Sequence, residues 1–105
     1  MQIKFFVEAE ESKDATRLVY ESLQEIDEII LKKEEKCVEP YWKMKDVYIV
    51  EFDMELYKDT LKNFLDIYSD VWIELGYPVD ELLASRDNEG CKYMKEGFIL
   101  VNLFL

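Results

Sequence analysis

The stretch VEFDMELY at residues 50–57 holds the carboxylates that could do chemistry in this chain. Glu51, Asp53 and Glu55 alternate with apolar residues, which predicts a strand with one buried face and one acidic face. On a regular strand these carboxylates follow one another at about 6.5–7 Å. Carboxylates that act as acid and base, or that bind a hard cation, usually converge in a concave pocket. Because a flat, solvated sheet face offers no such pocket, we interpret them as a docking face, with a plain solvated face as the alternative.

Other catalytic groups are scarce. The chain has no histidine, which removes the commonest general base and metal ligand. It has no phosphate-binding glycine loop, nucleophile elbow, metalloprotease motif or EF-hand loop. Cys37 and Cys91 lie far apart and form no metal-binding pair. We therefore predict no catalytic residue, no metal site and no cofactor.

Aromatic residues give a second signal for binding. Tyr41 and Trp42 follow Pro40, which assigns them to an edge strand. Neighbouring strand residues face opposite ways, so one of the two is expected to point outward. Tyr and Trp are favoured anchors of protein interfaces, and acidic side chains around them suit a partner rich in Arg and Lys. An acidic turn near residue 88 is the next surface to consider. The candidate partner-binding residues are Glu51, Asp53, Glu55, Tyr41, Trp42, Asp87 and Glu89.

The charge balance favours a basic protein as the partner. The 105 residues include 24 acidic and 13 basic side chains, which gives a net charge of −11. Such a charge repels nucleic acid and anionic membranes and attracts basic proteins, although it also serves solubility alone. Half of the residues are hydrophobic and 14% are aromatic, so the chain can form a core, unlike a disordered acidic tail. We expect one domain over residues 1–105, with neither a nucleic-acid nor a membrane partner.

The N-terminus and the hydropathy indicate a cytoplasmic protein. No apolar stretch approaches the roughly 20 residues that cross a membrane. The opening residues MQIKFFVEAE have only a short apolar run before the first acids, unlike a secretory signal. In the reducing cytoplasm, Cys37 and Cys91 are expected to be free thiols.

The first half of the chain predicts three strands and one helix. Ser12 is a candidate N-cap, and apolar residues recur at helical spacing after it. Pro40 either demotes its strand to a sheet edge or gives it a bulge. In chain order we predict a strand at residues 3–9, a helix from Ser12 to Ile30, a solvated connection at 32–36, an edge strand at 37–44, a turn at 45–46 and a strand at 47–56.

The second half predicts a helix and two further strands. Apolar residues at helical spacing up to Trp72 indicate a helix from about Asp59 that ends before Gly76. The nearly continuous apolar run at residues 98–105 predicts a strand buried on both faces or inside the sheet. Between them we predict a short strand at residues 82–85 and a turn at 87–90.

This order, β-α-β-β-α-β-β, predicts the fold class. We expect an α+β fold with two helices packed on one face of a four- or five-stranded, mostly antiparallel sheet. A ferredoxin-like arrangement with one added strand is the first choice. In that arrangement the second sheet face meets water, and Glu51, Asp53 and Glu55 project from it.

The segments MQIKFFVEAEESKDA, YWKMKDVYIVEFDMEL, DVWIELG and LLASRDNEGC, with the apolar ending, resemble small bacterial immunity proteins. These are antidotes encoded beside polymorphic or contact-dependent growth-inhibition toxins. The resemblance covers most of the chain and rests on element order, length and acidity. It implies a cytoplasmic inhibitor that binds one cognate toxin domain, often a nuclease, and has no activity of its own. No residue roles carry over from it.

Two alternatives stay open. A DNA-mimic inhibitor of a defence system would use the same carboxylates as stand-ins for phosphates. A small ligand-binding or enzymatic ferredoxin-like domain would instead have a polar pocket between its sheet and its helices. The sequence makes no prediction of the oligomeric state.

Overall fold

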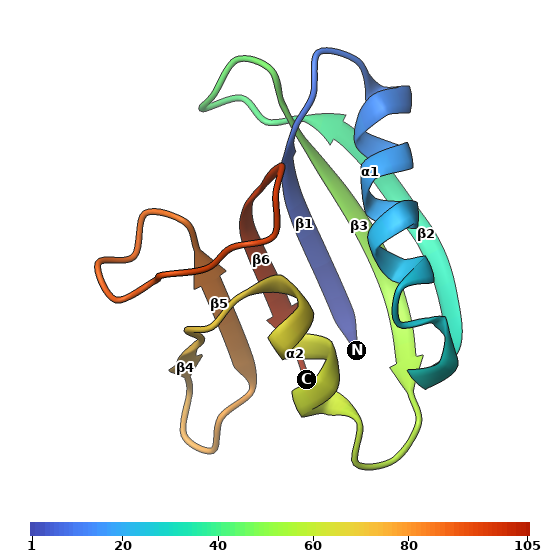
Figure 1. Ribbon diagram of the computed structural model, residues 1–105, viewed down its shortest axis with the longest axis vertical. Coiled ribbons are helices and arrows are strands. Elements are labelled where there is room, and N and C mark those ends of the chain that lie inside the picture. The colour runs from blue at the N-terminus through green and yellow to red at the C-terminus, as the bar shows by residue number, and fades with distance from the viewer.

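Two helices lie on one face of a six-stranded antiparallel sheet in the computed structural model, which describes residues 1–105 (Figure 1). The helices are α1 (Ser12–Gln24) and α2 (Leu61–Tyr68), and neither is long and apolar enough to cross a membrane. The strands in chain order are β1 (Gln2–Glu8), β2 (Ile30–Pro40), β3 (Val47–Leu56), β4 (Ile73–Leu75), β5 (Glu81–Ser85) and β6 (Phe98–Phe104). Within the sheet their order is β2-β3-β1-β6-β5-β4.

The predicted α+β class, with two helices against an antiparallel sheet, is confirmed. The predicted four or five strands and the ferredoxin-like order are not matched. Between α2 and β6 the chain forms two strands, β4 and β5, rather than one. These two strands extend the sheet beyond β6, and the sheet therefore has six strands.

The first helix is shorter than predicted, and the strand after it is longer. α1 ends at Gln24, and a single 3₁₀ turn, η1 (Asp27–Ile29), leads directly into β2. The charged segment predicted as a solvated connection is part of this strand, and its residues 32–35 pair with residues 52–55 of β3. Because β2 is an edge strand with two register shifts, its charged side chains stay in water while its backbone pairs with β3.

The second helix ends at Tyr68, several residues before the predicted end. Ser69 is extended, with φ −160° and ψ 156°, and its hydroxyl donates to the carbonyl oxygen of Tyr93 at 3.1 Å. This side-chain bond to the backbone competes with a further helical turn. Trp72 therefore lies beyond the helix, where it is partly buried and its indole Nε1 donates to the Leu65 carbonyl at 3.1 Å. The predicted last helical turns form the edge strand β4 instead.

The core lies between the helices and the sheet and contains 16 buried residues in one cluster. The ring of Tyr68 is at its centre, 5.1–5.3 Å from the rings of Phe5, Phe64 and Phe98. Burial raises the pKa of Tyr68, so its hydroxyl stays protonated and neutral. This hydroxyl shares a 2.8 Å hydrogen bond with Ser22 Oγ of α1, which satisfies the buried polar group.

The sheet face opposite the helices is called here the open face. Ile3, Phe5 and Val7 of β1 are buried beneath the helices. The residues between them have side chains on the other side of the sheet, because side chains of a strand alternate. The register therefore places Gln2, Lys4 and Phe6 of β1 on the open face, beside Asp53, Glu51 and Ile49 of β3.

The last strand, β6, lies inside the sheet between β1 and β5, which agrees with one of its two predicted placements. Phe98, Val101 and Leu103 are buried in the core. Leu100 and Phe104 pair with open-face residues of β1 and are only partly buried. The core therefore accounts for the apolar residues on one face of this strand, and the apolar residues on its other face lie on the open face.

Candidate protein-binding face

All three predicted carboxylates of β3 project from the open face. Glu51 pairs with Lys4 of β1, Asp53 with Gln2, and Glu55 with Lys32 of β2. The residues that alternate with them, such as Phe52, are buried on the helix side. The strand pattern thus predicts both the element and the direction of these side chains correctly.

The three carboxylates have different surroundings. Glu51 accepts a hydrogen bond from Gln2 Nε2 at 2.7 Å and lies 3.9 Å from Lys4 Nζ, and its side chain is only 21% exposed. Asp53 is 58% exposed, and one carboxylate oxygen lies 3.7 Å from the N-terminal ammonium. Glu55 is exposed on the same strand. Asp53 and Glu55 are therefore more available to a partner than Glu51.

Lysines interrupt the acidic row that the sequence predicts. The edge strand β2 adds Glu34 opposite Asp53, but it also adds Lys32 opposite Glu55. Lys36 of the same strand lines a shallow depression with Glu51 and Asp53. The local surface is therefore a mixture of both signs rather than a uniform acidic strip.

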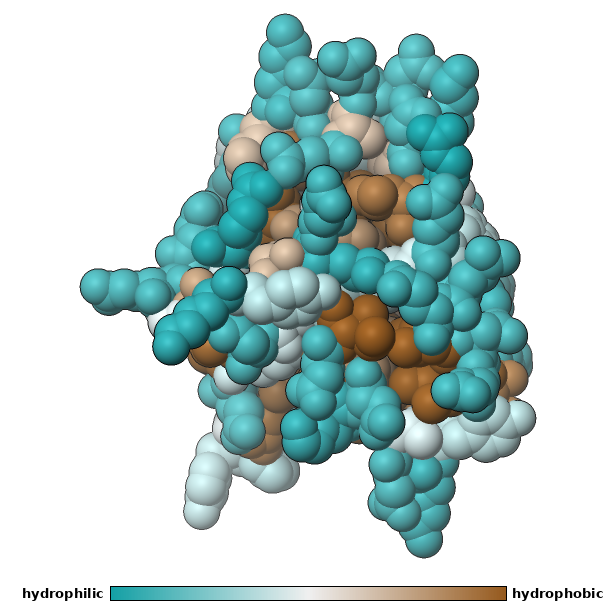
Figure 2. Space-filling view, viewed as in Figure 1, coloured by the Kyte–Doolittle hydropathy of each residue, from teal (hydrophilic) through white to brown (hydrophobic).

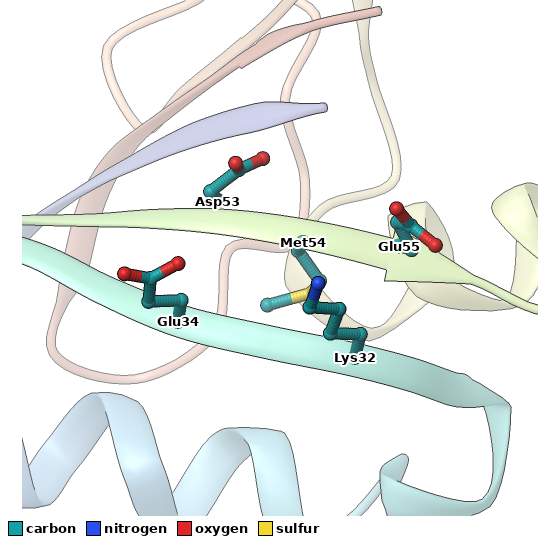
Figure 3. Close-up of a pocket in the computed structure, with 5 residues that line it drawn as sticks. All are labelled: Lys32, Glu34, Asp53, Met54 and Glu55. Atoms are coloured by element: carbon teal, nitrogen blue, oxygen red, sulfur yellow. The ribbon is translucent and has the colours of Figure 1, made fainter.

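This charged area forms no enclosed pocket for a substrate. The cavity lined by Lys32, Glu34, Asp53, Met54 and Glu55 has a volume of only about 40 Å³, and the larger depression beside Glu51, about 460 Å³, is open to solvent. Figure 3 shows its carboxylates spread along two strands rather than turned toward one point. No group of three or more acidic or cysteine side chains is arranged to hold a metal ion, and the two cysteines form no disulfide.

Tyr41 and Trp42 lie in the loop at residues 41–46 rather than on a strand, because β2 already ends at Pro40. The Tyr41 ring packs edge-on against Phe6 of the open face, with the ring centroids 5.0 Å apart. Trp42 is the outward residue of the pair, with 83% of its surface exposed. Lys43 Nζ lies 5.2 Å from the Trp42 ring centroid. The loop thus holds an exposed aromatic ring at one end of the open face.

An apolar stripe on the open face was not predicted from the sequence. On β3, Ile49 pairs with Phe6 of β1, and Phe6 pairs with Leu100 of β6. All three side chains are partly buried by their neighbours, and no helix covers them. Within this half of the stripe, the Tyr41 ring contacts Phe6.

The same stripe continues to the far edge of the sheet. Leu83 of β5 lies diagonally beside Leu100, because it pairs with Asn102, two residues further along β6. Leu83 also pairs with Ile73 of the edge strand β4, which is 39% exposed. The apolar stripe, which consists of Ile49, Phe6, Leu100, Leu83 and Ile73, therefore crosses the sheet from β3 to β4.

Asp87 and Glu89 are exposed in the loop after β5. In the sheet, β1 and β6 lie between β5 and β3, and the structure does not bring these two residues together with Glu51, Asp53 and Glu55. The neighbouring Arg86 bonds to Glu8 at 2.6 Å, which attaches the loop to the end of β1. We therefore treat Asp87 and Glu89 as a separate surface.

The helix side of the molecule offers a weaker candidate. Figure 2 shows this side as mostly hydrophilic, with some apolar surface near its middle. A shallow depression beside α1 is lined by Glu21, Glu25 and Glu96, and Lys95 forms an ion pair with Glu25. Apolar side chains fill the space between the sheet and the helices. The ligand-binding alternative, which needs a polar pocket there, is therefore poorly supported.

Tyr20, Tyr68 and Asp70 have shifted pKa values, and all three lie away from the open face. Burial raises the pKa of Tyr20, and the nearby Glu35 carboxylate raises it further. The backbone N–H of Tyr93 lowers the pKa of Asp70, and other backbone donors contribute. Asp70 thus fastens the segment before β6 to the end of α2. These groups support the fold and form no common site.

Comparisons of this chain with protein families, with curated proteins and with solved structures found no match. The geometry of the open face is therefore the observation from which a function can be proposed.

Proposed function

We propose that the protein is an immunity-type inhibitor that binds and neutralises a cognate, basic toxin domain, such as a nuclease, in the cytoplasm. The observation that carries the proposal is the open face, where an apolar stripe, carboxylates and the exposed Trp42 lie together without a covering helix. A patch with an apolar centre and a polar rim is typical of protein interfaces.

Inhibition by occupation requires no chemistry from the inhibitor. A bound protein can exclude substrate from a toxin by covering its active surface. The carboxylates of the open face are spread along two strands (Figure 3) and converge on no enclosed pocket, which suits this role better than catalysis. In the proposal, Trp42 and the apolar stripe supply the desolvated centre of the interface.

The net charge of −11 supports a basic partner. Because lysines interrupt the local acidic row, the attraction comes from the charge of the entire chain more than from β3 alone. Long-range attraction of this kind raises the rate of encounter and decreases with added salt. A toxin domain that binds nucleic acid carries the complementary charge.

The DNA-mimic alternative has less support from the open face. A surface that imitates a phosphate backbone needs an uninterrupted row of negative charges. Lys4, Lys32 and Lys36 lie among the carboxylates of β2 and β3. The apolar stripe also has no counterpart in a phosphate backbone.

The proposed function is tested with the toxin domain encoded beside the gene for this chain. We expect co-expression to restore the growth of cells that produce the toxin domain, and the two proteins to elute together as a stoichiometric complex. A catalytically inactive form of the toxin domain permits the same elution experiment without toxicity. Absence of both the complex and the growth recovery would overturn the proposal.

A further inference from the structure

The apolar stripe has the dimensions of one side of a helix. It crosses five strands, which lie about 4.8 Å apart, so its length is about 19 Å. At 1.5 Å per residue, a helix of about 13 residues covers this length. Along the strands the stripe is one or two open-face positions wide, about 7 Å. This shape matches the apolar side of an amphipathic helix better than the broad apolar face of a second sheet.

Carboxylates border the apolar stripe on both sides. Glu51 and Glu81 lie on one side of it, with Lys4 between them, and Glu8 lies on the other side. Glu39 pairs with Ile49 at its β3 end. Carboxylates therefore outnumber cations around the stripe, and its border is acidic on balance rather than uniformly.

These flanking carboxylates are partly engaged within the chain. Glu81 accepts a hydrogen bond from Asn102 Nδ2 at 2.8 Å, and Glu8 bonds to Arg86. A carboxylate offers about four acceptor positions, so each of them can still bind a cation from a partner. The internal bonds also hold the carboxylates in place, which reduces the entropy lost on binding.

The charge of the flanks argues against a second copy of this chain as the occupant. Another chain with a net charge of −11 would place carboxylates near these carboxylates. Like charges facing each other across an interface weaken binding. Cationic side chains on both sides of an apolar ridge fit the stripe and its flanks together.

We infer that the apolar stripe binds an amphipathic helix of the partner, with the apolar side of the helix on the stripe and Lys or Arg residues along both flanks. The inference takes the basic character of the partner from the proposed function and adds the element that is recognised. Leu83 and Leu100 are the central contacts, since they lie in the middle of the stripe.

The experiment uses a 14-residue peptide of Leu and Lys whose sequence places Leu on one side of a helix. A scrambled peptide of the same composition is the control for charge alone. Titration into the ¹⁵N-labelled full chain, followed by NMR, locates the bound peptide. We expect amide shifts at the apolar stripe with the amphipathic peptide and weaker, dispersed shifts with the scrambled peptide.

Two variants test the contact directly. Leu83→Thr and Leu100→Thr should each weaken binding of the amphipathic peptide about tenfold, because each removes a central apolar contact. Leu31→Thr is the matched control, since Leu31 is an exposed leucine on the edge strand β2 and lies outside the stripe. Circular dichroism verifies that all three variants fold.

Three results would overturn the inference. Equal binding of both peptides would mean that only charge is recognised. Unchanged affinity in both stripe variants would place the peptide elsewhere. A dimer in sedimentation experiments that Leu100→Thr dissociates would identify a second copy as the occupant. The titration uses no toxin, so a negative result would overturn this inference and leave the growth-recovery test of the proposed function unaffected.

Discussion

Trp42 and Glu51 were both predicted as binding residues, but their surroundings give them different roles. Trp42 has 83% of its surface free and lies beside Tyr41 and Lys43 of its own loop, so a partner can bury most of the ring. Glu51 is held by Gln2 and lies near Lys4, so much of its charge is already compensated. The affinity is therefore expected to depend more on the aromatic ring than on this carboxylate.

Replacing Trp42 with alanine should weaken toxin binding without affecting the fold. Removal of an exposed side chain changes the free energy of unfolding by about 0.5 kcal/mol or less. Loss of an interface anchor costs about 2 kcal/mol of affinity, mainly through faster dissociation. Surface plasmon resonance measures both rates. Tyr77→Ala is the matched control, because Tyr77 is also fully exposed but lies in the connection between β4 and β5.

Ser22 and Tyr68 share a hydrogen bond, and removing one hydroxyl or the other should lower the free energy of unfolding by different amounts. Tyr68→Phe leaves Ser22 Oγ bonded to the Val19 carbonyl at 2.7 Å, so we expect a loss of about 1 kcal/mol. Ser22→Ala leaves the buried Tyr68 hydroxyl without its partner, and the cost is expected to be about 1–3 kcal/mol. Urea unfolding of both variants gives the comparison. A larger loss for Tyr68→Phe would contradict this account of the core.

Asp70 should make stability depend on pH in the acid range. Backbone N–H groups of Tyr93 and Lys92 bond to its carboxylate, and its pKa in the folded chain is lowered. Its stabilising effect is therefore complete above the unfolded pKa of about 4 and disappears as the pH falls through the lower folded value. The wild-type chain should therefore be more stable than Asp70→Ala above the unfolded pKa, and this difference in stability should disappear as the pH falls through the folded pKa.

The measurement is urea unfolding of wild type and Asp70→Ala at several pH values between neutral and about 2. Only the difference between the two proteins is informative, because other carboxylates also titrate in this range. Asp66→Ala is a suitable control, since Asp66 contacts only Lys62 on the surface of α2. If the difference in free energy of unfolding between wild type and Asp70→Ala does not change with pH, the Asp70 carboxylate does not stabilise the fold in the proposed way.

Among the secondary-structure elements, β3 and the start of α1 could be predicted well because their patterns have one interpretation. VEFDMELY alternates strictly, and the predicted strand at residues 47–56 matches β3. The boundary between α1 and β2 was wrong, because Ile29 and Ile30 continue the helical spacing while the charged residues after them resemble a linker. An edge strand tolerates such charges, and the sequence alone does not reveal which strand is at the edge.

The binding face could be predicted only in part for a similar reason. The alternation in β3 identifies its acidic face, but Leu100 and Phe104 belong to a strand that is apolar at nearly every position. Such a strand suggests burial on both sides. Only the register with β1 and β5 shows that Leu100 and Phe104 share the uncovered side. Lys32 and Lys36 were likewise assigned to a connection and not to the face.

Substitutions in β6 should separate its two sides. Val101→Asp should prevent folding, because Val101 is fully buried and an unpaired buried carboxylate costs several kcal/mol. Leu100→Asp should remain folded but less stable, since Leu100 lies on the open face and its new carboxylate can reach water. A strand buried on both faces, which is one of the placements predicted from the sequence, would instead make Leu100→Asp or Phe104→Asp prevent folding. Urea unfolding decides between the two expectations, and an unfolded Leu100→Asp chain would mean that this face is covered.

The chain as a whole combines a net charge of −11 with one sheet face that no helix covers. In the proposed function, the charge acts over a distance of about 8–10 Å in physiological salt and guides a basic partner toward the chain. The open face would then act only after contact, where burial of apolar surface slows dissociation. The two contributions should therefore appear in different rate constants.

The most direct test of binding through the open face is the kinetics of the complex with the neighbouring toxin domain at two salt concentrations. Asp53→Lys with Glu55→Lys changes the open face, and Glu21→Lys with Glu28→Lys makes the same change of net charge on the side of α1 and η1. We predict that association slows in both double variants and with added salt, whereas dissociation accelerates only in the open-face variant. Equal dissociation rates in the two double variants would contradict the assignment of the binding surface to the open face.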